Sequence, residues 1–290
     1  MKASTKIMAI TIAALAFMVS VIWFAAFREA RNGLLTVSFL NIGQGDSIFI
    51  DAPSGRQVLI DGGPNSIVLR ELSKKMPWWD RSIDVVIPTH PDADHVGGLI
   101  DVLARYKVST IIQSDVLGDT ETSAALQDAI SREKAQEIIA KRGQIIDLGS
   151  DSNSEMHAYI EILFPDRSVP NLDTNDACVV TRLVYGETAF MLSCDAPQSI
   201  EEYLAQLDGE DLGSDVLKAG HHGSRTSSSE LFVGFVSPEF GVFSRGCDNK
   251  YGHPHKEVID TFDKFDIPVL DTCANGTITF VSEGQKVTKK

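Results

Sequence analysis

The stretch THPDADHVGG at residues 89–98 carries four potential metal ligands within six residues, namely His90, Asp92, Asp94 and His95. The aliphatic run at 83–87 predicts a buried strand before it, and the periodic apolar segment at 96–106 predicts a helix after it. Loops at strand ends are where rigid scaffolds place functional groups. Helix capping needs one Asp, so it does not explain two Asp flanked by two His. The stretch therefore predicts a metal site.

The rest of residues 34–290 alternates twice between strand-rich stretches and helices. This pattern predicts an α/β (α+β) fold in which two packed sheets carry helices outside, in four αββα layers. Strands are expected at 34–42, 47–51, 57–60, 108–113, 144–148, 159–164, 178–185, 188–193, 215–219, 241–244, 267–270 and 277–281. Further helices are expected at 65–75, 120–142 in two pieces, 199–207, 229–236 and 256–265. The polar residues 147–155 predict a surface loop.

The N-terminus carries an apolar run from Ile7 to Phe27. As a helix these residues would span roughly 31 Å, close to the ~30 Å hydrocarbon core of a bilayer. We expect an uncleaved membrane anchor at 1–33 and one globular domain at 34–290. Lys2 and Lys6 should keep the N-terminus cytoplasmic, so the domain would face outside. Cleavage as a signal peptide, which would give a secreted form, stays open.

The net charge limits the kinds of partner. The 290 residues carry a formal charge of −14, and residues 34–290, with 22 basic and 39 acidic side chains, carry −17. A broad basic surface for nucleic acid is therefore excluded. The net charge does not exclude a local site that gains positive charge from bound cations.

Three further clusters of potential ligands lie at expected element ends. Asp195 follows the strand at 188–193, His221 and His222 follow the strand at 215–219, and His253 lies just before the helix at 256–265. Six of the seven His residues lie in the clusters at 90–95, 221–222 and 253–255. The sequence therefore predicts that several strand ends meet at one site.

With these motifs the chain resembles the metallo-β-lactamase-fold hydrolases. His90-x-Asp92-x-Asp94-His95 matches their HxHxDH motif with Asp in place of the middle His. Together with NIGQGDSIFI (41–50), LIDGG (59–63), LKAGHHGS (217–224) and YGHPH (251–255), it resembles the hydrolase domain of ComEC-type competence proteins. The resemblance covers residues 34–290, and the motifs keep the family's order.

The resemblance implies a site with two metal ions. His90 and Asp92 would hold the first ion, with Asn175 (or Asp176) as a third ligand; Asp94, His95 and His221 would hold the second. Asp195 would bridge the two ions, and Asp61 and Asp46 would orient ligands. Because Asp92 replaces a neutral His, Mn²⁺ is favoured, with Zn²⁺ or Mg²⁺ as alternatives.

The resemblance also implies hydrolysis by a water that the two ions activate, with Asp94 orienting that water. Lys218 would add positive charge near the site. His222 and His253 are candidates to protonate a leaving alkoxide or, equally, structural hydrogen-bonding residues. Ser224, Thr226 and Ser227, before the helix at 229–236, would seat a phosphate. A Ser-rich helix cap is the alternative for these hydroxyls.

Two positions depart from the family pattern. Cys194 stands where a Gly usually precedes the bridging Asp, and Cys273 stands where the family has Asp, so activity could be altered. A Cys178–Cys194 bridge would join the two arms of an expected hairpin. The connectivity of the four Cys residues cannot be read from the sequence.

We expect a phosphodiesterase or nuclease acting on DNA outside the cytoplasm, working alone or with a separate channel protein. Two alternatives stay open. One is hydrolysis of small or envelope esters, such as a phosphocholine ester, a lactone or a β-lactam. The other is a non-catalytic, metal-bound module of a DNA-uptake machine.

Overall fold

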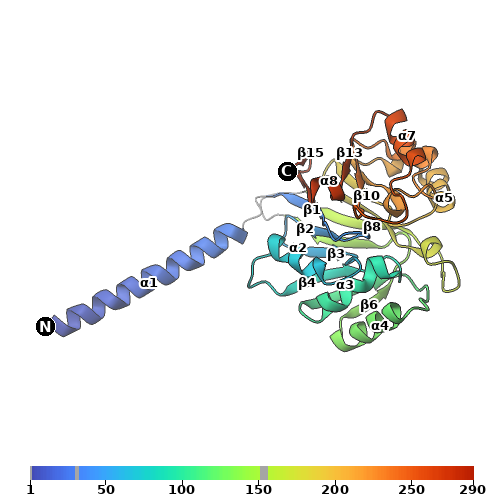
Figure 1. The fold of residues 1–290 in the computed structure, drawn as a ribbon. Coiled ribbons are helices and arrows are strands. Elements are labelled where there is room, and N and C mark those ends of the chain that lie inside the picture. The colour runs from blue at the N-terminus through green and yellow to red at the C-terminus, as the bar shows by residue number, and fades with distance from the viewer. Residues whose placement is uncertain (1, 30–32, 151–155) are drawn as a thin grey trace. The chain divides into compact units, whose positions relative to one another are not determined.

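The computed structural model describes residues 2–29, 33–150 and 156–290, so residues 151–155 of the polar loop expected at 147–155 lie outside the described residues. The chain divides into two compact units, Met1–Asn32 and Gly33–Lys290 (Figure 1). The first unit is the helix α1 (Lys2–Glu29). Its segment Thr5–Trp23 is long and apolar enough to cross a membrane, and none of it is buried.

The second unit contains an eight-stranded sheet with the order β15-β14-β1-β2-β3-β4-β5-β6. Its strands are β1 (Leu35–Phe39), β2 (Ile48–Asp51), β3 (Gln57–Ile60), β4 (Ser82–Ile87), β5 (Lys107–Gln113), β6 (Gln136–Ile139), β14 (Ile278–Ser282) and β15 (Val287–Lys289). The strands β3 to β6 run parallel to one another, so their carboxyl ends share one edge.

A seven-stranded sheet has the order β13-β12-β11-β10-β9-β8-β7. Its strands are β7 (Ile145–Gly149), β8 (Ala158–Phe164), β9 (Val180–Tyr185), β10 (Thr188–Leu192), β11 (Val216–Lys218), β12 (Phe240–Phe243) and β13 (Val269–Asp271). The expected hairpin is confirmed, since β9 and β10 pair antiparallel. The strands β10 to β13 run parallel.

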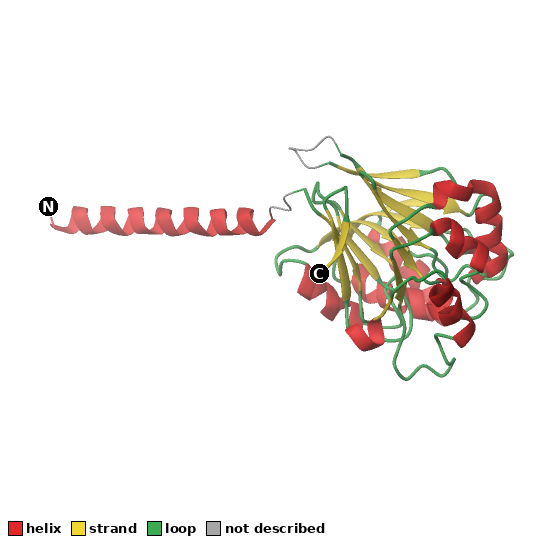
Figure 2. Ribbon diagram, turned by 90° about the horizontal axis from the view of Figure 1, so that it is seen from above, coloured by secondary structure: helices red, strands yellow, loops and turns green. Residues whose placement is uncertain are grey.

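The two sheets pack face to face with helices on both outer sides, as Figure 2 shows. A core cluster joins Phe39 and Ile60 of the first sheet to Ile160 and Phe190 of the second. The helices α2 (Ile67–Lys75), α3 (Ala93–Leu103) and α4 (Glu121–Glu133) cover the first sheet. The helices α5 (Gln198–Asp208), α6 (Glu230–Val236) and α7 (Lys256–Lys264) cover the second. The predicted αββα sandwich is confirmed.

Three local predictions need correction. The segment 120–142 is one helix, α4, followed by the strand β6, because residues 136–139 pair with β5 instead of continuing the helix. The helix α3 begins at Ala93, within the ligand stretch, with Asp92 as its N-cap. The C-terminal strand β15 and the short helix α8 (Thr272–Asn275) were not expected.

Both positions that depart from the family pattern are halves of disulfides. Cys194 is bonded to Cys178, and Cys273 is bonded to Cys247. The first bridge joins the entry of β9 to the turn after β10, and the second joins the loop after β12 to α8.

Candidate metal centre

The candidate site lies where the carboxyl ends of strands from both sheets meet. From the first sheet come Asp46 before β2, Asp61 after β3 and the 90–95 stretch between β4 and α3. From the second sheet come Asp195 after β10 and Lys218, the last residue of β11. His221 and His222 follow in the short 3-10 helix η3 (Gly220–Gly223). The predicted convergence of strand ends is therefore present.

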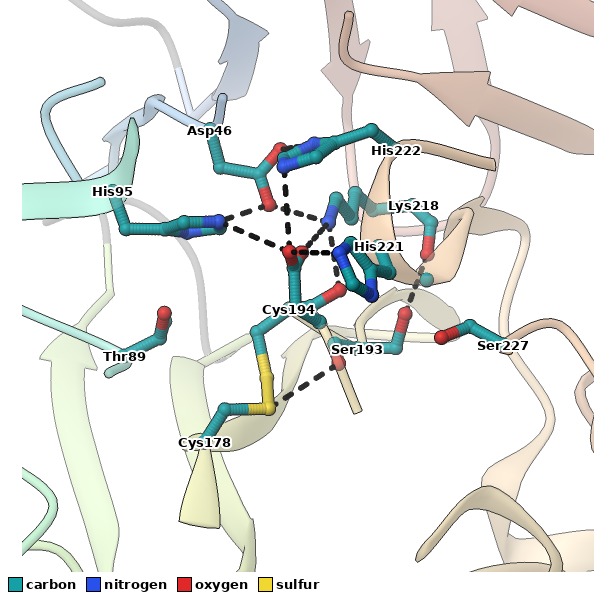
Figure 3. Close-up of polar contacts among 12 residues, drawn as sticks. Asp46, Thr89, His95, Cys178, Ser193, Cys194, Lys218, His221, His222 and Ser227 are labelled. Carbon is teal, nitrogen blue, oxygen red and sulfur yellow. Dashed lines mark hydrogen bonds and ion pairs between the residues drawn. A yellow bond between two sulfur atoms is a disulfide. The ribbon is translucent and has the colours of Figure 1, made fainter. Parts of the chain in front are cut away.

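The Asp195 carboxylate lies at the centre of this cluster. Its Oδ2 is 3.3 Å from Nε2 of His95, 3.3 Å from Nε2 of His222 and 3.6 Å from Nε2 of His221. Its Oδ1 is 3.3 Å from Nζ of Lys218. Figure 3 shows His95, Lys218, His221 and His222 pointing toward a common centre from different segments of the chain. One carboxylate therefore faces groups from both sheets.

Donor atoms cluster closely enough to hold metal ions in two groups that share Asp195. One group contains His90, His95 and Asp195, and the other contains Asp46, Asp195 and His222; within each, the donor atoms lie within 4.8 Å of one another. A further group, Asp94, His95 and His222, meets the same limit. Among the described residues, His222 belongs to two of these three groups and His221 to none.

Two buried carboxylates fix the orientation of the histidine rings. Oδ2 of Asp61 is 2.8 Å from Nδ1 of His95, and Asp61 also accepts hydrogen bonds from the N–H and hydroxyl of Thr89. Oδ1 of Asp46 lies 3.4 Å from Nδ1 of His222, and its other oxygen pairs with Lys218. Both rings therefore turn Nε2 toward Asp195, the arrangement that metal-ligating His residues adopt when a carboxylate holds the other nitrogen.

The backbone around Asp46 leaves no room for a side chain at Gly45. The N–H of Asp46 donates to the carbonyl of Asp94 over 3.2 Å. Gly45 has φ +122°, and a Cβ there would lie 1.9 Å from the Asp94 carbonyl oxygen. The glycine of NIGQGD is therefore required for the turn before β2 to reach the ligand stretch.

The electrostatics of the cluster favour cations. Burial lowers the pKa of His90 well below its ordinary value. Burial acts in the same direction on His222, but Asp195 and Asp46 outweigh it and raise its pKa to about 9. For His95, burial is likewise outweighed by Asp195 and Asp61, which raise its pKa well above the ordinary value. Protons on His95 and His222 thus balance the buried carboxylates, and metal binding to such a site would displace them.

Four other predicted residues lie at the border of the cluster. Asp92 is 39% exposed, with Oδ2 3.8 Å from Nε2 of His90, and Asp94 is 35% exposed, with Oδ2 3.4 Å from Nε2 of His222. Asn175, in the 3-10 helix η1 (Asn175–Ala177), has a buried Oδ1 without a hydrogen-bond partner among the described residues. His253 is buried, its ring centroid 5.7 Å from that of His221. Burial, followed by the charges of His222 and His221, lowers its pKa to about 4, so it is neutral at pH 7.

The expected phosphate seat needs correction. Ser227 is fully buried and its hydroxyl donates to the Ala196 carbonyl. The N–H groups of Ser228 and Ser229, before α6, donate to the Glu201 carboxylate over 2.8 Å. The start of α6 is therefore occupied by a carboxylate of the protein itself. Ser224 and Thr226 contact each other, and only Thr226 is exposed.

Sequence reasoning missed Glu201 and Thr89. Glu201 is one of several acidic residues in an amphipathic helix, and nothing in the sequence marks it as buried. Thr89 directly precedes His90 and is buried, with its hydroxyl oxygen 3.0 Å from Nδ1 of His90. The sequence feature that could have identified Thr89 is its position between a predicted buried strand and His90, the first predicted ligand.

Comparisons with known proteins agree with this geometry. The family model of the Metallo-beta-lactamase superfamily matches residues 40–233. ComE operon protein 3 of Bacillus subtilis is 29% identical over 84% of this chain and 32% of its own length. Recombination protein 2 of Haemophilus influenzae is 26% identical over 87% of this chain and 29% of its own length. The chain thus spans about a third of these relatives.

Among solved structures, the metallo-beta-lactamase fold protein YhfI of Bacillus subtilis shares the fold. Its TM-score is 0.53 at 14% identity, and the match covers 86% of this chain and 99% of that one. The matched segment contains the ligand stretch, Asp195, and the paired His221 and His222. On the fold, the site and the family match together, the chain belongs to the metallo-beta-lactamase superfamily.

Proposed function

We propose that the chain is a membrane-anchored, dinuclear-metal phosphodiesterase that cleaves DNA outside the cytoplasm during DNA uptake. The single observation that carries the chemistry is the central Asp195 carboxylate, which histidines of both sheets face within 3.3 Å. The names of two relatives support the substrate: Recombination protein 2, and Competence protein ComA of Neisseria gonorrhoeae, which is 40% identical over 38% of this chain and 16% of its own length. Two disulfides and the apolar N-terminal helix support the location, because disulfides persist in oxidising compartments.

We propose that these donors hold two divalent ions. His90, Asp92 and Asn175 would hold the first ion, and Asp94, His95 and His222 the second, with Asp195 shared. Nε2 atoms of His90, His95 and His222 are buried without hydrogen-bond partners among the described residues, as expected of atoms that await a metal. His222 takes the place expected of His221, since His222 belongs to groups of clustered donor atoms and has Oδ1 of Asp46 3.4 Å from its Nδ1.

Bound ions would supply Lewis acidity that activates water and offsets the negative charge developing on the phosphate oxygens. The protein's own residues supply the alignment. Asp61 and Asp46 fix the rings of His95 and His222, and Lys218 holds Asp46 and Asp195 in place. Asp94, half-exposed at the border, is placed to orient the attacking water. His221 is 29% exposed, and burial lowers its pKa, so its neutral ring is placed to accept a proton during the reaction.

Oxygen-rich ligation through Asp92, Asp94 and Asp195 favours Mn²⁺ over Zn²⁺. We further propose that the chain works with a channel protein that carries the DNA across the membrane, a proposal that the competence name of one relative supports. The site would then process DNA at the entrance of that channel.

The test is hydrolysis by the full chain in detergent, stripped with a chelator and reloaded with Mn²⁺, Mg²⁺ or Zn²⁺. Substrates are single- and double-stranded DNA beside chromogenic phosphodiester, phosphocholine, lactone and β-lactam substrates. We expect Mn²⁺-dependent DNA cleavage that is lost in Asp92→Ala and Asp94→Ala. Cleavage of esters alone would contradict the substrate, activity with Zn²⁺ alone would contradict the metal, and DNA uptake unaffected by Asp94→Ala would indicate a non-catalytic module.

A further inference from the structure

Two neighbouring tryptophans project from the loop between α2 and β4. Trp78 is 79% exposed and Trp79 is 39% exposed, and their ring centroids lie 5.6 Å apart. They precede β4, whereas the ligand stretch at 90–95 follows it. Contiguous exposed apolar side chains rimmed by polar residues mark sites of interaction with a protein or a membrane.

The sheet register places these tryptophans at the end of the second unit where the chain enters it. Thr36 of β1 faces Asp51 of β2, which in turn faces Gln57 of β3. The side chain of Gln57 donates to Asp80, the residue after Trp79. The beginnings of β1 and β4 therefore lie at the same end of the strands. The candidate metal centre lies at the opposite end, beyond the carboxyl ends of β3 and β4.

Three basic side chains lie at the paired beginnings of β5 and of β4, the strand just after the tryptophans in the chain. Arg81, Arg105 and Lys107 are exposed, and the Lys107 N–H donates to the Arg81 carbonyl. Asp80 is half-buried and accepts hydrogen bonds from Gln57 and Ser82. We call Trp78, Trp79, Arg81, Arg105 and Lys107 the tryptophan edge. It is a cationic, aromatic surface on a body whose formal charge is −17 over residues 34–290.

We propose that the tryptophan edge rests on the surface of an anionic lipid bilayer. Tryptophan prefers the membrane–water interface, because its ring is apolar and its N–H is polar. Arginine and lysine at the same edge would contact anionic headgroups. Only residues 30–32 separate α1 from Gly33, so a membrane-spanning α1 would keep the entry of the second unit within ~14 Å of the helix end.

Such a contact gives the second unit a defined orientation. The candidate metal centre lies at the carboxyl ends of the strands whose amino ends carry the tryptophan edge, so it would face the solution and stay open to DNA. This proposal rests on the membrane location proposed above, but not on nuclease activity.

The test uses the full chain with Trp23→Phe, which leaves Trp78 and Trp79 as the fluorophores. The protein is reconstituted in nanodiscs of phosphatidylglycerol or phosphatidylcholine with brominated acyl chains, which quench tryptophan on contact. We expect at least a twofold loss of fluorescence in brominated phosphatidylglycerol. The loss should be smaller in phosphatidylcholine, at high salt and in Arg105→Gln/Lys107→Gln.

The matched control moves the probe to the other end of β5. It combines Trp23→Phe, Trp78→Phe and Trp79→Phe with Leu117→Trp, because Leu117 is 76% exposed in the loop after that strand. We expect no quenching there. Equal quenching of both probes would overturn the proposal. Protection of Trp78 and Trp79 from iodide by duplex DNA, without quenching by lipid, would overturn it in favour of a nucleic-acid partner. Quenching by brominated lipid does not depend on catalysis. A chain that is quenched as expected but does not cleave DNA would therefore support the membrane contact and contradict only the proposed nuclease function.

Discussion

Cys178 is bonded to Cys194, the residue that directly precedes the central carboxylate Asp195. The Cys194 carbonyl also accepts hydrogen bonds from Nζ of Lys218 and the N–H of His221. The disulfide thus anchors a turn whose backbone carbonyl contacts two other residues of the candidate metal centre. Cys194 has φ +45°, a conformation in which glycine is more often found.

Removing this bridge should weaken both folding and metal binding. The variant Cys178→Ala/Cys194→Gly loses the constraint on a loop with a sequence separation of 16, worth about 3 kcal/mol by loop entropy. We expect a melting temperature lower by several degrees and a weaker affinity for Mn²⁺, measured by calorimetry. The control, Cys247→Ala/Cys273→Ala, should lower the melting temperature but leave the affinity. Equal losses of affinity in both variants would contradict a positioning role for the first bridge.

Lys218 is fully buried between Asp46 and Asp195. In the metal-free protein, Lys218→Met should destabilise the fold by roughly 3–5 kcal/mol, because it leaves buried carboxylates without their counter-charge. Excess Mn²⁺ should recover part of this loss. Thermal melts in chelator and in Mn²⁺ measure both effects. The exposed Lys256→Met serves as the control and should leave the melt unchanged; a wild-type melt for Lys218→Met would refute the assignment.

The two adjacent histidines should differ in metal binding. Loss of a residue that orients a metal ligand typically lowers metal affinity by roughly 10–100-fold, and we expect Asp46→Asn to lower the Mn²⁺ affinity within that range. We expect His222→Ala, which removes a ligand itself, to lower the Mn²⁺ affinity further. His221→Ala should keep the affinity and lower the rate of DNA cleavage. Titration calorimetry and cleavage rates separate the two. Loss of Mn²⁺ affinity in His221→Ala, with affinity kept in His222→Ala, would show that His221 is the ligand.

The buried Glu201 should make stability depend on pH. Burial raises its pKa to about 7, although the Ser228 and Ser229 N–H groups oppose this. The folded protein then binds more protons than the unfolded one between about pH 4.3 and 7, so this contribution to stability falls as pH rises through that window. Melting temperatures of Glu201→Gln should change less between pH 5 and 8 than those of the wild type. Melting temperatures that change equally with pH in Glu201→Gln and the wild type would contradict a role for Glu201 in the pH dependence.

The fold was predictable because alternating strand and helix patterns repeat along residues 34–290 and agree with the packed layers. Residues 136–139 show where such reasoning ends. Their composition continues a helical pattern, and only pairing with β5 makes them a strand. Pairing between distant segments is a tertiary effect that local periodicity does not report.

The candidate metal centre was predictable as a set of residues, but not in its internal roles. His221 and His222 both have positive φ, so the side-chain directions expected of a strand or helix do not apply to them. Sequence alone could not tell which ring faces Asp195. The phosphate seat failed because the hydroxyl-rich segment at 224–229 folds onto Glu201, a partner that only the packing of α5 against α6 supplies.

The central claim is that two divalent ions share Asp195. The most direct measurement is the metal content of the full chain by mass spectrometry after loading with Mn²⁺ and removal of free metal, for the wild type and Asp195→Asn. The account predicts two equivalents of Mn²⁺ per chain in the wild type and at most one in Asp195→Asn. A wild type that cleaves DNA with one equivalent or none, or an Asp195→Asn variant that keeps two, would contradict it.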